Sequence, residues 1–160
     1  MIINKNKTYI GNNKSQDKQK WYIIDAKNQK LGRLSSKIAF LLRGKDDYSY
    51  TPYFQSNIHI IIVNSQLIEI TGKKREKKLY KRHSGRPGGL KIENFKNLQQ
   101  RMPNRIIEKS IKGMLPKNIL GRQLFRQLKI YSYNKHPHSS QQPLQINLHS
   151  IKENNVEYIK

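Results

Sequence analysis

The stretch Ile58-His59-Ile60-Ile61-Ile62-Val63 decides the fold of this chain of 160 residues. Its apolar character is nearly continuous rather than alternating, which is typical of a strand covered on both faces. Strands of this kind occur in parallel sheets whose connections are helices. The stretch therefore predicts an α/β fold rather than a sheet with one face open to water.

The segment before this stretch supplies a second strand and a connecting helix. Trp21-Tyr22-Ile23-Ile24 is a short apolar run that suits a buried strand, and residues 25–31 form a turn in our interpretation. Gly44 is suited to end the following helix in a left-handed conformation. With a third strand expected over residues 67–71, the predicted order is strand, helix, strand, strand. The apolar face of the helix consists of Leu34, Ile38, Leu41 and Leu42.

The C-terminal half of the chain predicts two helices and a short strand. Pro103 is placed to begin the first helix, and Asn118 to cap the second. The last strand is expected over residues 129–131. The side chains expected to point inward are Ile106, Ile107, Ile111, Met114, Leu120, Leu124, Phe125 and Leu128.

The chain predicts one domain with two polar extensions. We expect a basic N-terminal arm over residues 1–20, because this segment is polar and shows no periodicity. The α/β core domain spans residues 21–131 and includes a basic loop over residues 73–91. Residues 132–160 are expected to form an extended C-terminal tail, because the prolines in this segment bias the backbone toward extended conformations.

The charge of the chain predicts a polyanionic partner. Lys and Arg number 32 against 10 Asp and Glu, a formal net charge of +22. Such a charge destabilises a compact domain through self-repulsion, and nucleic acid can neutralise it with release of counterions. An anionic membrane surface is the weaker alternative, because such binding normally uses an amphipathic helix with large apolar residues. The sequence shows neither a bilayer-spanning apolar stretch nor a secretory signal, so we expect no membrane partner.

Residues 73–91 concentrate the positive charge. This stretch holds nine Lys or Arg and one Glu, and it includes the run Ser84-Gly85-Arg86-Pro87-Gly88-Gly89. Glycines let a backbone approach phosphates closely, while Tyr80 and His83 can stack on bases or bond to 2′-hydroxyls. RNA is favoured over DNA because no recognition helix is apparent. A second cationic face is expected on the two C-terminal helices.

Patterns for catalysis and metal binding are weak. Asp25 follows the first strand, where α/β enzymes often place chemistry, but a turn carboxylate is the better interpretation. His83-Ser84 has no acidic third member nearby. The chain has no Cys, and no Asp or Glu near His136 and His138 completes a set of metal ligands. We therefore expect no enzyme activity, metal, cofactor or small-molecule substrate. A nucleotide-using α/β enzyme and a DNA-binding basic protein are the alternatives.

Four blocks of sequence occur in order between residues 21 and 143. The first block comprises Trp21-Tyr22-Ile23-Ile24-Asp25-Ala26, Leu31-Gly32-Arg33-Leu34 and Leu42-Arg43-Gly44-Lys45. The second block comprises Thr71-Gly72-Lys73-Lys74 and His83-Ser84-Gly85, and the third is Lys112-Gly113-Met114-Leu115-Pro116-Lys117-Asn118. The last block comprises His136-Pro137-His138 and Gln141-Gln142-Pro143. Together they resemble the L13 (uL13) family of large-subunit ribosomal proteins. The resemblance implies a three-layer α/β/α fold with a central, mostly parallel sheet of about four strands. It also implies binding to large-subunit (23S-type) rRNA beside neighbouring large-subunit proteins, an early place in assembly and no catalysis.

The resemblance also implies that residues 73–89 are a main rRNA contact and that Arg122, His136 and His138 lie against RNA. The composition, with 23 Lys, 21 Ile and 15 Asn but 9 Arg, favours AT-rich codons. We therefore expect a plastid (chloroplast) ribosome in the stroma, with the bacterial cytoplasm as the alternative. The predicted RNA-binding residues are Lys73, Lys74, Arg75, Lys77, Lys78, Tyr80, Lys81, Arg82, His83, Arg86, Arg105, Lys109, Lys112, Arg122, Arg126, His136 and His138.

Overall fold

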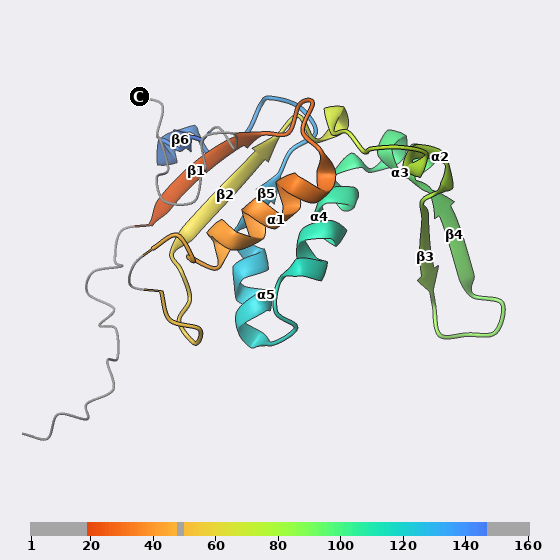
Figure 1. Cartoon of the computed structure of the whole chain (residues 1–160), viewed down its shortest axis with the longest axis horizontal. Coiled ribbons are helices and arrows are strands. Elements are labelled where there is room, and N and C mark those ends of the chain that lie inside the picture. Colours follow the sequence, from red (N-terminus) through yellow and green to blue (C-terminus); the bar gives the residue numbers. More distant parts are fainter. Residues whose placement is uncertain (1–18, 48–49, 147–160) are drawn as a thin grey trace, which may run out of the picture.

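The computed structural model describes residues 19–47 and 50–146 and shows a central sheet flanked by helices (Figure 1). Within the described residues the sheet has four strands in the order β5-β2-β1-β6, and every neighbouring pair is parallel. The α/β fold with a mostly parallel sheet is therefore confirmed. The strands are β1 (Lys20–Asp25), β2 (Ile58–Val63), β5 (Leu128–Ile130) and β6 (Leu144–Gln145).

Three helices lie close to where the sequence predicts them. Their bounds are α1 (Leu31–Leu42), α4 (Pro103–Met114) and α5 (Ile119–Arg126). Gly44 has a φ of +69°, as expected for a left-handed residue after α1. Asn118 caps α5, because its Oδ1 accepts a hydrogen bond of 2.9 Å from the Gly121 amide. These end signals are local, which is why the sequence reveals them.

The core lies between the sheet and helices α1 and α4. Alternate residues of the two central strands, such as Ile24, Ile60 and Ile62, are buried in one cluster with Ile38 of α1 and Ile107 of α4. Helices α1 and α4 also contact each other directly. One face of the sheet is thus covered by helices, and the lack of apolar–polar alternation in β2 requires the other face to be covered as well.

The opposite face of the sheet carries a cluster of rings. The Trp21 ring stacks on His59 at a centroid distance of 4.3 Å, and His138 lies 5.4 Å from Trp21. The Tyr131 hydroxyl hydrogen bonds with Nε2 of His138 at 2.8 Å. After β5 the chain places His138 against Trp21 on this face, passes through the 3₁₀ helix η3 (Ser139–Gln141), and then pairs as β6 with β1. No pattern in the sequence predicts β6.

The N-terminal arm and much of the C-terminal tail expected from the sequence lie outside the described residues. Of the arm predicted over residues 1–20, only residues 19 and 20 are described, and Lys20 already belongs to β1. Of the tail predicted over residues 132–160, residues 132–146 are described. The division into arm, core and tail stays a proposal.

The expected third strand over residues 67–71 is wrong. After Asn64, which has a φ of 58°, the chain forms the 3₁₀ helix η2 (Ser65–Leu67). The following residues make only an isolated parallel bridge, between Lys30 and Glu69, within the described chain. This segment is therefore not a strand, although the apolar Ile68 within it is buried.

The predicted basic loop over residues 73–91 is also wrong in part, because most of it is regular structure. It contains α2 (Lys74–Lys77), β3 (Leu79–His83) and the start of β4 (Leu90–Asn94), which pair as an antiparallel hairpin. The run rich in Gly and Pro is the turn between these two strands. Helix α3 (Phe95–Arg101), which follows β4, was not predicted. Met114 of α4, expected to point inward, is 47% exposed because it is the last residue of its helix.

Candidate nucleic-acid interface

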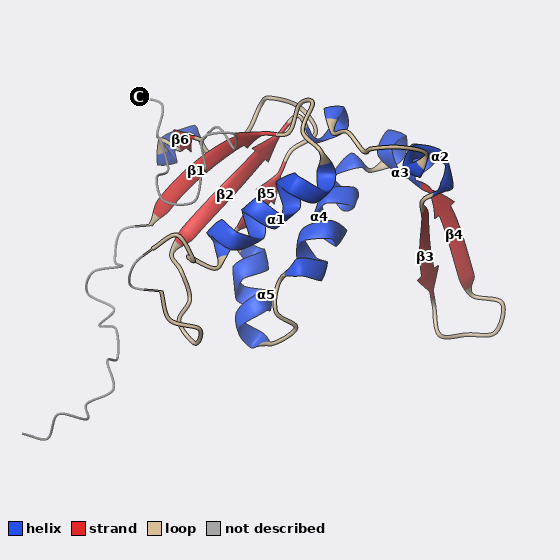
Figure 2. Ribbon diagram, in the orientation of Figure 1, coloured by secondary structure: helices blue, strands red, loops and turns tan. Residues whose placement is uncertain are grey.

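The β3–β4 hairpin projects away from the central sheet, with α3 at its base (Figure 2). Its register places Arg82 opposite Lys91 and Tyr80 opposite Glu93. At the tip, the Ser84 amide donates to the Gly89 carbonyl at 3.2 Å. Gly85 and Gly88 have φ values of +89° and +69°, which side chains rarely tolerate, so the turn requires glycine there.

Positive charge covers the hairpin and is not neutralised by acidic neighbours. Every Lys and Arg from residue 73 to residue 91 is exposed. Arg82 and Lys91 lie directly opposite each other, and like charges in this position destabilise a strand pair. The repulsion between Arg82 and Lys91 lowers the stability of the free protein, and an anion bound between the two side chains would remove this repulsion.

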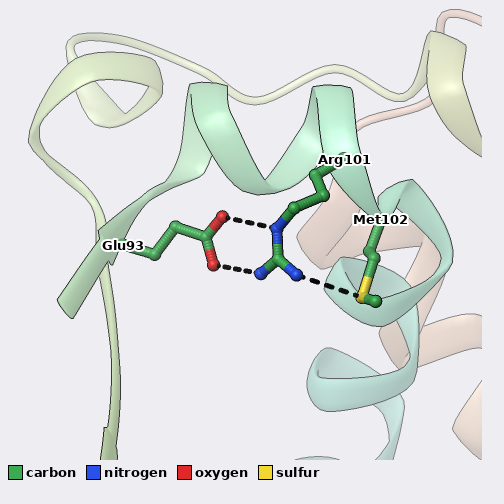
Figure 3. Close-up of polar contacts among 3 residues, drawn as sticks. All are labelled: Glu93, Arg101 and Met102. Carbon is green, nitrogen blue, oxygen red and sulfur yellow. Dashed lines mark hydrogen bonds and ion pairs between the residues drawn. The ribbon is translucent and has the colours of Figure 1, made fainter. Parts of the chain in front are cut away.

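One ion pair fixes the hairpin to the rest of the chain (Figure 3). Glu93 of β4 accepts two hydrogen bonds from Arg101 at the end of α3, at 2.7 and 3.1 Å. These hydrogen bonds lower the pKa of the Glu93 carboxyl. Arg101 is therefore occupied by a carboxylate, unlike the cations of the hairpin.

Tyr80 links the hairpin to helix α4. Its ring lies 6.5 Å from that of Phe95, and burial raises the pKa of its hydroxyl. Lys78 Nζ and Lys109 Nζ lie 5.6 and 5.1 Å from the centre of the Tyr80 ring. Tyr80, predicted to contact RNA, thus brings a cation of the hairpin region and a cation of α4 to one place.

A second aromatic ring links α4 to α5. Lys112 Nζ lies 5.8 Å from the centre of the Phe125 ring, and Phe125 is partly buried against the core. Arg122 and Arg126 of α5 flank this ring in sequence and are exposed, as are Arg105 and Lys109 on α4. The two cationic faces predicted from the sequence are therefore joined through Tyr80 and Phe125.

The three predicted histidines occupy two places, His83 on the hairpin and His136 with His138 near the sheet. His83 lies on β3, where its Nδ1 accepts a hydrogen bond of 2.9 Å from the Gly85 amide. In the neutral ring the proton then sits on Nε2, which can donate to an acceptor in RNA. His138 belongs to the ring cluster on the opposite face of the sheet, and His136 Nδ1 accepts from the His138 amide at 3.2 Å. His136 and His138 are not brought together with the hairpin.

The described residues provide no metal site and no membrane span. Among them, no group of three or more His, Asp or Glu side chains is arranged to hold a metal ion. No helix in this part of the chain is long and apolar enough to cross a bilayer. Asp25 closes a turn, since its Oδ1 accepts from the Lys27 amide and from the Asn64 side chain, both at 2.9 Å.

Comparison with known proteins decides the family. A family model described as Ribosomal protein L13 matches residues 19–137, which include the hairpin, α4 and α5. The chain belongs to the ribosomal protein L13 family. It is 64% identical to the large ribosomal subunit protein uL13c of Gracilaria tenuistipitata var. liui over 138 residues, covering 86% of this chain and 95% of that protein. It is 53% identical to the uL13 protein of Acaryochloris marina over 145 residues, covering 91% of this chain and 95% of the relative.

In this member of the L13 family, several cations beside the cationic surface are not among the RNA-binding residues predicted from the sequence. Lys91 lies opposite Arg82, and Lys30 and Arg33 lie near Lys74 in a shared pocket. For Lys91 a signal was present, because it belongs to the basic stretch. Lys30 and Arg33 lack such a charge signal, because both are isolated cations in a segment of ordinary charge, although Arg33 belongs to the first of the four sequence blocks.

The ring cluster predicts a pH-dependent stability. Burial lowers the pKa of His59 below its ordinary value of 6.5, and the charges of Lys129 and His138 lower it further. Within the described residues, His59 Nδ1 is buried without a hydrogen-bond partner. The unfolded chain takes up a proton near pH 6.5 more readily than the folded chain does. The free energy of unfolding should therefore fall as the pH decreases below about 6.5.

Urea unfolding at pH 7 and pH 5.5, followed by the fluorescence of Trp21, measures this effect. His59→Phe keeps a ring against Trp21 and removes the titrating group, so its loss of stability at low pH should be smaller than that of the natural chain. His83→Gln, an exposed histidine on the hairpin, is the control and should behave like the natural chain. The same pH dependence in the His59→Phe variant would contradict the role of His59.

Proposed function

We propose that this chain is a structural component of the large ribosomal subunit and binds large-subunit rRNA. The observation that carries the proposal is the junction of the hairpin, α4 and α5 cations through Tyr80 and Phe125. Membership of the L13 family and relatives named large ribosomal subunit proteins support the same function. The net charge of +22 favours a partner of this kind, because RNA supplies a high density of phosphates.

In this proposal the α/β core is a rigid platform and the cations neutralise RNA phosphates. The core presents side chains of β3, α4 and α5 at fixed positions, and the glycine-rich tip lets the backbone approach RNA. Side chains such as Arg82 and Arg86 suit bidentate phosphate contacts, whereas the lysines act as point charges. The proposed RNA contacts are the predicted set, with His136 and His138 on a separate surface on the opposite face of the sheet. We also propose that the protein contacts neighbouring large-subunit proteins and joins the subunit early in its assembly.

The proposal places the protein in plastid ribosomes. The similarity to a red-algal uL13c protein and to cyanobacterial uL13 proteins supports this location. The high content of Lys, Ile and Asn, which favours AT-rich codons, agrees with an organellar genome. A bacterial ribosome is the second location consistent with the cyanobacterial relatives.

Sedimentation of native lysate on a sucrose gradient tests the proposal. The protein should migrate with the large subunit and stay with it after a high-salt wash, because an integral ribosomal protein makes many simultaneous RNA contacts. A protein found mainly free would overturn the proposal. A nucleotide screen by thermal shift and a comparison of affinities for rRNA and duplex DNA would then distinguish the enzyme from the DNA-binding alternative.

A further inference from the structure

A pocket of about 260 Å³ lies between the start of α1 and the base of the hairpin. Four cationic side chains line it: Lys30 and Arg33 from the start of α1, and Lys74 and Lys78 from the region of α2. No acidic residue is among its described lining residues. We propose that this pocket binds a phosphate group of the RNA backbone, with Lys30 and Arg33 as additional contacts. The inference rests on the proposed function and adds a site to it.

Backbone hydrogen bonds hold the two walls of the pocket together. The Asn28 amide donates to the Leu67 carbonyl at 3.1 Å, and the Glu69 amide to the Gln29 carbonyl at 2.9 Å. The Leu31 amide then donates to the Glu69 carbonyl at 2.9 Å. Because these bonds fix the start of α1 beside the chain that enters α2, the backbone that carries the four cations is already in place before binding, which reduces the ordering cost to that of the side chains.

The charges in the pocket favour a phosphate. Four like charges around one cavity repel each other, and an anion between them removes this repulsion. Helix α1 has no acidic residue in its first turn and no capping side chain. The amides of Gly32 and Arg33 have no acceptor within the helix, so the start of α1 adds to the field of the side chains.

Gly32 is a second indication of a ligand. It lies in the first turn of α1, where glycine stabilises a helix less than alanine does. A Cβ atom on Gly32 would have no neighbour within 4 Å, so nothing in the described chain requires a glycine there. A glycine that lines a cationic pocket leaves space for an anion to reach the backbone amides.

The described lining suits the sugar–phosphate backbone better than a free nucleotide. The hydroxyl of Thr71 can donate to a phosphate oxygen, and Leu31 and Ile70 give an apolar margin. No aromatic ring is among these residues, so a nucleobase would have no aromatic stacking partner in the pocket. We therefore assign the pocket to a phosphate within an RNA strand.

Two variants of the full chain test the assignment in binding to a large-subunit rRNA fragment. Lys30→Gln combined with Arg33→Gln should weaken binding by about tenfold or more and flatten the salt dependence of log K by about 0.9 for each phosphate that is no longer neutralised. Lys27→Gln combined with Lys45→Gln is the control, because it removes the same charge from exposed residues outside the pocket. Gly32→Ala should raise the melting temperature of the free protein and still weaken RNA binding several-fold.

The outcomes separate this inference from the proposed function. If Gly32→Ala leaves RNA affinity unchanged, or if the pocket double variant loses no more affinity than the control, the pocket assignment is overturned. A parallel titration follows the amide resonances of Gly32 and Arg33. If inorganic phosphate shifts them and the rRNA fragment does not, the site takes free phosphate and the RNA assignment is wrong. If the natural chain binds rRNA no better than duplex DNA, the proposed function itself fails.

Discussion

Replacing Lys81, Arg82 and Arg86 by glutamine should reduce rRNA affinity on the order of 10²-fold at physiological salt. The slope of log K against log salt should become flatter by about two to three units, since each phosphate contact contributes about 0.9. All three side chains are exposed on the hairpin or its tip, so their removal opens no cavity. Removing Arg82 also relieves its repulsion of Lys91, so the free protein should be at least as stable as the natural chain.

Fluorescence anisotropy with a labelled large-subunit rRNA fragment, over a series of salt concentrations, measures both quantities. The matched control replaces Lys27, Lys45 and Lys117 by glutamine, which lowers the net charge equally at exposed positions away from the hairpin. This control should lose much less affinity. Equal flattening of the slope in the two variants would show that total charge, and not the hairpin, determines binding.

Replacing Ile107 by alanine should lower the free energy of unfolding by about 2–5 kcal/mol. Ile107 is fully buried on α4, where it packs in the cluster with α1 and the central strands. Truncation removes buried methyl groups and leaves a cavity that the neighbouring side chains fill only in part. A loss of this size is a large fraction of the stability of a single domain.

Urea unfolding of the free protein measures the effect, with Met114→Ala as the control on the same helix. Met114 is 47% exposed, and surface substitutions usually change stability by less than about 0.5 kcal/mol. If the two variants lose the same amount of stability, the orientation of α4 against the sheet is not the one described. The comparison also tests the correction to Met114, which the sequence places with the buried residues of this helix.

Continuous apolar runs and helix-end signals allowed most of the central fold to be predicted. Strands β1 and β2 and helix α1 depend on residues that are buried together, so the apolar runs of the strands and the helical spacing of α1 are visible along the chain. The residues of the hairpin are not buried together in this way. Its apolar side chains Leu79, Leu90 and Ile92 are about half exposed, so neither face of the hairpin is fully buried. Helix α3 was hidden for a related reason, since Phe95 and Leu98 are its only two buried residues.

The positive charge of the candidate site could be predicted from the sequence, but the contacts that bring its cations together could not. The density of Lys and Arg identifies the hairpin, and helical spacing identifies the row on α4. That Tyr80 brings these two sets together depends on packing between segments far apart in sequence. The pocket cations Lys30 and Arg33 reach Lys74 because the backbone near Gln29 pairs with that near Glu69, a contact that no local pattern encodes.

Strand β6 has a consequence for synthesis of the chain. It pairs Tyr22 of β1 with Leu144, so the edge of the sheet joins two residues from opposite ends of the described chain. Contacts this distant in sequence form slowly, because a long loop must close before they stabilise the fold. During translation, β1, α1, β2 and the basic hairpin emerge long before β6. The nascent chain therefore displays the cations that we propose to bind RNA while one edge of the sheet is still open, and β6 pairs with β1 only after residue 145 has been made.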